Sequence, residues 1–113
     1  MGTFSINVRL PSGQEVEALV DPGATFTKLP RPVLESIGVS GAFVREFEIG
    51  DGRTVHRRVG YVEVEVDGRR APVPVAFADP GERPLLGATA LEILGFSVDP
   101  QRRRLVPTPA LDV

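Results

Sequence analysis

The sequence lacks cysteine altogether and contains a single histidine, His56. Without cysteine, the chain has no disulfide, no thiol nucleophile and no thiolate ligand for a metal. One histidine cannot build a multi-histidine metal site within one chain. The Gly-x-Ser-x-Gly motif of serine hydrolases is also missing. We therefore expect neither a metal ion nor any other cofactor.

Long apolar runs and an excess of basic residues are missing as well. No uncharged stretch approaches the roughly 20 residues that span a bilayer, and the first residues do not resemble a signal peptide. The formal net charge is −2, whereas proteins that bind phosphate backbones normally carry a clear basic excess. We therefore expect a cytoplasmic protein that binds neither membrane nor nucleic acid.

The length and composition are those of one ordinary domain, which we place at residues 1–113. Apolar residues make up 42% of the chain and charged residues 25%, as in typical domains with a hydrophobic core. The 12 glycines and 11 prolines fall at regular intervals between short segments. Such punctuation is typical of a mostly β fold with many short strands.

Apolar and polar residues alternate in most of these segments, and alternation predicts strands. The expected strands are 4–10, 14–20, 42–49, 54–66, 71–78, 85–86, 96–99 and 104–107. Two short helices are expected at 31–38 and 88–94, and glycines suited to helix ends close both. Pro72 and Pro74 favour an edge position for their strand, because proline has no N–H to donate.

The segment ALVDPGATFTKLP, residues 18–30, is the most informative in the chain. An apolar strand runs into Asp21, and Pro22 and Gly23 follow before a series of small residues. Such a loop can hold a working carboxylate, or it can be an ordinary turn. The same tripeptide recurs at residues 79–81, where Glu-Arg follows, and there we interpret it as a plain turn.

Further motifs follow in a characteristic order. Asp-x-Gly-Ala-Thr stands at 21–25, a Gly-Asp-Gly hairpin tip at 50–52, and Leu-Leu-Gly-Ala at 85–88, where it opens a helix. From about residue 4 to residue 107, the chain resembles the retropepsin-like (retroviral-type, clan AA) aspartic proteases, in particular their small prokaryotic members. The resemblance implies an acid-protease fold, a closed or partly open β-barrel with a flap hairpin and one or two short helices.

The resemblance also implies a homodimer that hydrolyses peptide bonds of peptides or unfolded proteins. In this family, each subunit supplies one aspartate, and the pair activates a water. Two carboxylates about 3 Å apart share one proton, so one acts as a base and the other as an acid. Only Asp21 occupies such a loop in this chain, and two chains are therefore needed for one site.

The family's other functional positions map onto three groups of residues. The catalytic loop continues through Pro22, Gly23, Ala24 and Thr25. The flap that closes over a substrate comprises Ile49, Gly50, Asp51, Gly52 and Arg53. The segment expected to pack beneath the catalytic loop is Leu85, Leu86 and Gly87.

Pro22 departs from the family pattern, which has Thr or Ser at this position. The hydroxyl there exchanges hydrogen bonds with the partner's backbone, and proline has neither a hydroxyl nor an N–H. Up to about four hydrogen bonds per dimer are lost, at roughly 1 kcal/mol each. Two functions stay open: an aspartic endopeptidase with an unusual loop, or a catalytically weak or inactive module that binds peptides or dimerises. A β-domain in which Asp21 merely forms a turn is the third interpretation.

The remaining candidates receive structural interpretations. His56 is expected to be an exposed residue of the flap hairpin, and Tyr61 a half-buried strand residue. Phe26 and Leu29, which follow the catalytic loop, are expected in the core rather than in a binding pocket.

Overall fold

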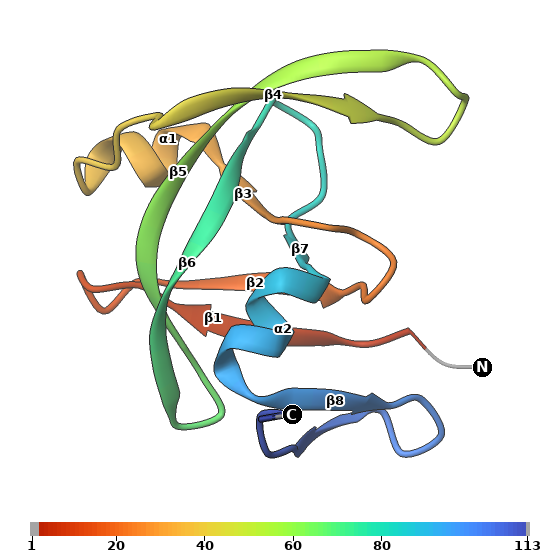
Figure 1. Ribbon diagram of the computed structural model, residues 1–113. Coiled ribbons are helices and arrows are strands. Elements are labelled where there is room, and N and C mark those ends of the chain that lie inside the picture. Colours follow the sequence, from red (N-terminus) through yellow and green to blue (C-terminus); the bar gives the residue numbers. More distant parts are fainter. Residues whose placement is uncertain (1–2, 113) are drawn as a thin grey trace.

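The computed structural model describes residues 3–112, and its backbone is mostly β (Figure 1). Within these residues the elements are β1 (Ser5–Arg9), β2 (Glu15–Val20), β3 (Thr27–Pro30), α1 (Arg31–Ser36), β4 (Phe43–Glu48), β5 (Thr54–Val66), β6 (Arg69–Ala78), β7 (Leu85–Leu86), α2 (Ala88–Leu94), β8 (Phe96–Asp99) and β9 (Arg104–Pro107). Neither helix is long and apolar enough to cross a membrane.

One curved sheet contains most of the strands, in the order β1-β2-β7-β3-β6-β5-β4. The long strand β5 also pairs with β1, opposite Arg9 at Glu65, so the sheet closes into a ring. β8 and β9 form a separate hairpin beside α2, at the bottom of Figure 1. The ring and the two short helices agree with the retropepsin-like fold expected from the sequence.

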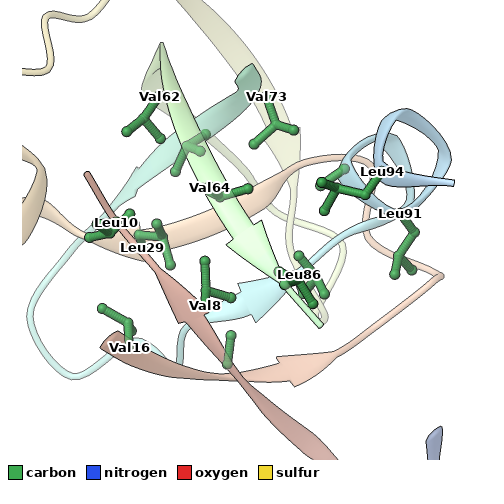
Figure 2. Packing of buried hydrophobic residues seen from close by; sticks show 14 of the residues in the cluster. Val8, Leu10, Val16, Leu29, Val62, Val64, Val73, Leu86, Leu91 and Leu94 are labelled. Atoms are coloured by element: carbon green, nitrogen blue, oxygen red, sulfur yellow. The ribbon is translucent and has the colours of Figure 1, made fainter. Parts of the chain in front are cut away.

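Apolar side chains from the strands and from α2 fill the ring. Figure 2 shows Val8, Leu29, Val64 and Leu86, from four different strands, around one common core. Alternation along β5 sends Val64 inward, while Glu63 on the opposite face is exposed. The core therefore holds β3 and β7, the two strands nearest the Asp21 loop, on the wall of the ring.

Most of the expected elements are confirmed, but β3 was not predicted. Its four residues, Thr-Lys-Leu-Pro, are too few for alternation to be recognised, and a proline ends them. The strand exists because it pairs in parallel with the distant β6 and also with β7. Helix α1 ends at Ser36, two residues earlier than expected.

Two further expectations need correction. β6 is not an edge strand throughout, because its second half lies between β5 and β3. Pro72 and Pro74 precede Val75, where pairing with β3 begins, so their missing N–H groups leave that ladder intact.

Tyr61 is 59% exposed rather than half-buried, since its neighbours Val62 and Gly60 take the inward positions. His56 is exposed, as expected.

Candidate active site

The loop between β2 and β3 holds Asp21 in a defined position. β2 pairs in parallel with β7, and the Asp21 N–H donates to the Leu86 carbonyl oxygen at 2.9 Å. The Gly23 N–H donates to Asp21 Oδ1 at 3.0 Å, and the Ala24 N–H donates to the Asp21 carbonyl oxygen at 3.1 Å. The half-buried carboxylate is therefore oriented by its own turn and by a strand more than sixty residues away in the chain.

The start of α2 fixes the other half of the same loop. The Ala88 N–H donates to the Ala24 carbonyl oxygen at 2.7 Å, and the Thr89 N–H donates to the Thr25 carbonyl oxygen at 3.1 Å. These two N–H groups belong to the first turn of the helix, where no earlier helical carbonyl can accept them. The Asp21 loop thus supplies the hydrogen-bond acceptors that the first turn of α2 lacks within the helix.

Gly87 lies where the two segments approach most closely. Its N–H donates to Oγ1 of the fully buried Thr27 at 3.1 Å. A Cβ atom at Gly87 would lie 2.5 Å from the Phe26 carbonyl oxygen, closer than any side chain tolerates. Leu86 is buried beneath the loop, whereas Leu85 faces the hollow beside Asp21.

A cleft of about 580 Å³ opens between the Asp21 loop and the β4–β5 hairpin. Its volume falls in the usual range of ligand sites. The residues expected in the site that line it are Asp21, Gly23, Ala24, Thr25, Ile49, Gly50 and Leu85. In Figure 1 the hairpin arches over the side of the molecule that carries the β2–β3 loop.

The other residues expected in the flap, Asp51, Gly52 and Arg53, shape the tip of the β4–β5 hairpin and do not line the cleft. The Ile49 N–H donates to the Arg53 carbonyl oxygen at 2.9 Å, and Gly52 adopts a φ of 86°, which favours glycine. Asp51 accepts hydrogen bonds from the backbone N–H and from the side chain of Arg53, and both lower the pKa of the Asp51 carboxyl. Asp51, Gly52 and Arg53 therefore act within the tip itself.

Phe26 was expected in the core, and that prediction is wrong. The residue precedes β3, in which Thr27 and Leu29 take the inward positions and are fully buried. By alternation, Phe26 and Lys28 point the other way, and both line the cleft. The Phe26 ring lies 5.6 Å from the ring of Phe47 on β4, measured between centroids.

The cleft also contains charged residues that the sequence analysis missed. Arg57 on β5 is only 7% exposed and donates from both terminal nitrogens to the two carboxylate oxygens of Glu82. Lys28 Nζ lies 3.7 Å from Glu82 Oε2. Arg57 shares its face of β5 with Val55 and Val59. A charged residue on this otherwise apolar face is the one feature of the sequence that could have indicated a buried ion pair.

The Arg57–Glu82 pair is ionised over a wide range of pH. Hydrogen bonds from Arg57 lower the pKa of Glu82 from 4.5 to about 2, although burial opposes the shift; the Asp79 N–H and Lys28 also contribute to it. The hydrogen bonds to Glu82, together with the negative charges of Glu82 and Asp79, raise the pKa of Arg57. Asp79 itself lies in the turn after β6, where it also pairs with Arg31 at 2.9 Å.

A second hollow, of about 1050 Å³, lies on the opposite side of the Asp21 loop. Pro22 lines this groove and not the cleft. Ile93 and Leu111 contribute exposed apolar surface to it, with 48% and 89% of their area accessible. Within residues 3–112, no group of three or more histidine, aspartate or glutamate side chains is placed to hold a metal ion.

The family model for aspartyl proteases matches residues 6–98, which include the Asp21 loop, the β4–β5 hairpin, β7 and α2. The chain therefore belongs to the retropepsin-like aspartyl protease family. This membership supports a hydrolytic, protease-type function. A search of the curated proteins found no match.

The ion pair predicts a particular dependence of stability on pH. Because the pKa of Glu82 is lower in the folded chain, its ionised form stabilises the fold above pH 4.5, and this contribution is lost as the pH falls to about 2. Glu82→Gln removes the titration and leaves Arg57 with only the longer ion pair to Asp79, at 3.7 Å. We expect the variant to be less stable at pH 7 by about 2 kcal/mol. As the pH is lowered, the free energy of unfolding measured in urea should fall less steeply for the variant than for the unaltered protein.

Glu63→Gln is the matched control, because it makes the same change in charge at an exposed pair whose atoms are 4.0 Å apart. Its stability should follow that of the unaltered protein at every pH. If the stability of Glu82→Gln also changes with pH in parallel with that of the unaltered protein, the ion pair does not stabilise the fold as described.

Proposed function

We propose that the protein is a homodimeric aspartic endopeptidase in which Asp21 and the partner's Asp21 activate a water. The observation that carries the proposal is the position of the loop. Asp21 lines a cleft large enough for peptide side chains, while the next residue, Pro22, lines an apolar groove. A second copy seated on the groove would bring its own loop beside this one, as an isologous contact requires.

In such a dimer the two carboxylates share one proton, because both cannot ionise at close range. The ionised carboxylate takes a proton from the water while the water oxygen attacks the peptide carbonyl carbon. The protonated carboxyl gives its proton to the carbonyl oxygen. When the C–N bond breaks, the nitrogen leaves with a proton from the dyad, and one hydroxyl of the intermediate returns a proton. The dyad therefore ends with the single proton that it had at the start.

The substrate would be a peptide or an unfolded protein bound in extended form. The flap hairpin covers the cleft from above, and its Ile49 and Gly50 lie on the cleft side. An extended peptide pairs through its backbone with such strands and places alternate side chains in pockets. This mode of binding explains why the site lies between a hairpin and a loop rather than in a closed cavity.

Pro22 favours the alternative, a peptide-binding or dimerising module with weak or no catalysis. Its ring contributes only apolar contact to the groove and cannot exchange hydrogen bonds with a partner loop. We favour the protease because the loop is otherwise complete: Asp21 is oriented by its turn, and four backbone hydrogen bonds tie the loop to itself, to β7 and to α2.

Asp21→Asn tests the catalytic assignment. Cleavage of an unfolded protein should fall by roughly a thousandfold or more, because the amide cannot take a proton from water. The circular dichroism spectrum and the melting temperature should change little. Asp67→Asn, in the exposed turn between β5 and β6, is the matched control and should cleave normally. Unchanged cleavage by Asp21→Asn would remove Asp21 as the catalyst.

Pro22→Thr tests the account of the unusual loop. The hydroxyl would restore up to about four hydrogen bonds per dimer, so the dissociation constant should fall by as much as about a thousandfold. Sedimentation velocity over a dilution series measures this constant directly. A dimer that is no tighter, together with unchanged activity, would show that Pro22 does not weaken the contact.

A further inference from the structure

Lys28 is the chain's only lysine, and it lines the cleft beside Asp21 and Phe26. It occupies the middle of β3, where its backbone is paired with β6 on one side and β7 on the other. This pairing makes the strand rigid, so the ammonium extends from a fixed base. The side chain is 18% exposed, and the exposed part faces the hollow.

The Lys28 ammonium has hydrogen-bonding capacity that the protein does not use. Glu82 already accepts from both terminal nitrogens of Arg57 and from the Asp79 N–H at 2.7 Å. Lys28 Nζ approaches Glu82 only to 3.7 Å, which is too far for a hydrogen bond. Among the described residues 3–112 this is its one contact with a carboxylate, and its three N–H groups stay available to a ligand.

Two positively charged side chains, Lys28 and Arg45, lie beside the Phe26 ring, in a cleft whose lining also includes acidic residues. Arg45 on the flap hairpin lies over the Phe26 ring, with its guanidinium carbon 5.7 Å from the centroid. Arg57 and Glu82 are paired with each other, so among the described residues Lys28 and Arg45 are the cations of the cleft lining without a hydrogen-bonded carboxylate. Glu46 and Glu48 of the same strand also line the cleft. Alternation along β4 places their side chains on the face opposite to that of Arg45 and Phe47.

We propose that Lys28, together with Arg45 and the Phe26 ring, forms a subsite for an acidic side chain of the substrate. The proposal rests on the proposed function in one respect, namely that the cleft receives an extended peptide. A glutamate suits the subsite, because its methylene groups pack on Phe26 while its carboxylate accepts hydrogen bonds from Lys28. A partly desolvated ammonium whose N–H groups have no hydrogen-bond acceptor is unfavourable, and a substrate carboxylate supplies the acceptor.

The alternative role of Lys28 is purely structural, as a second cation that helps to neutralise Glu82. The two roles differ in what they predict for substrates. A structural lysine affects all peptides equally, whereas a recognition lysine discriminates between glutamate and its uncharged isostere glutamine. The test therefore compares matched peptides rather than total activity.

The probe is a set of fluorescein-labelled octapeptides of alanine, valine and phenylalanine, with one glutamate moved along the positions and a glutamine counterpart for each. Binding to the Asp21→Asn protein is followed by fluorescence anisotropy, so that no peptide is consumed. At one position we expect glutamate to bind about tenfold more tightly than glutamine. This comparison requires no change at Lys28 and does not depend on how a Lys28 variant folds.

Lys28→Met in the Asp21→Asn background should abolish the preference and leave the glutamine peptides nearly unaffected. Lys28→Glu should reverse the charge preference, so that a peptide with lysine at the same position binds best. Arg70→Met is the matched control, because it removes one positive charge from an exposed strand residue outside the cleft. The control should keep the preference for glutamate.

Equal affinities for glutamate and glutamine at every position, or a preference that survives in Lys28→Met, would overturn the proposal. Cleavage of the same peptides by the unaltered protein separates this failure from that of the proposed function. Cleavage without preference for glutamate leaves the protease standing and removes the role of Lys28. A glutamate preference in binding without any cleavage supports Lys28 and contradicts the protease.

Discussion

The hydrogen bonds between the Asp21 loop and the segment around Gly87 are the contacts on which the site depends. They join the end of β2 to β7 and to the first turn of α2, and they require that residue 87 has no side chain. Because the two segments are distant in sequence, the position of the Asp21 carboxylate is a property of the whole fold. A local turn of the same sequence, such as Asp79-Pro80-Gly81, has no such support from β7 and α2.

The cleft has a carboxylate on one side and an ion pair on the other. Asp21 lies on one wall, in a loop whose own amides orient it. Across the hollow, Arg57 and Glu82 form an ion pair that stays charged down to acidic pH, since the pKa of Glu82 is about 2. That pair links β5 to the loop before β7, while Lys28 lines the cleft. In the proposed dimer, the same site would combine a proton shared at Asp21 with a fixed charge pattern for recognition.

Much of the fold could be predicted from the sequence, because alternation along β5 and the glycines at helix ends are local signals. The Asp21 loop was identified through its order relative to the flap tip and the Leu-Leu-Gly-Ala segment. Strand β3 could not be predicted, since parallel pairing with β6 creates it. Phe26 was wrongly expected in the core because the alternation of β3 places Thr27 and Leu29 inward instead. The Arg57–Glu82 pair could not be predicted, because it joins elements that only the folded sheet brings together.

The central claim is that one carboxylate per chain becomes a catalyst only as half of a pair. Mixing the unaltered protein with an equal amount of Asp21→Asn protein, and allowing the subunits to exchange, tests it most directly. If two aspartates are needed, only dimers of unaltered chains cleave, and the activity per total protein should fall to about a quarter. A fall to about half would show that each carboxylate works alone, and would contradict the account.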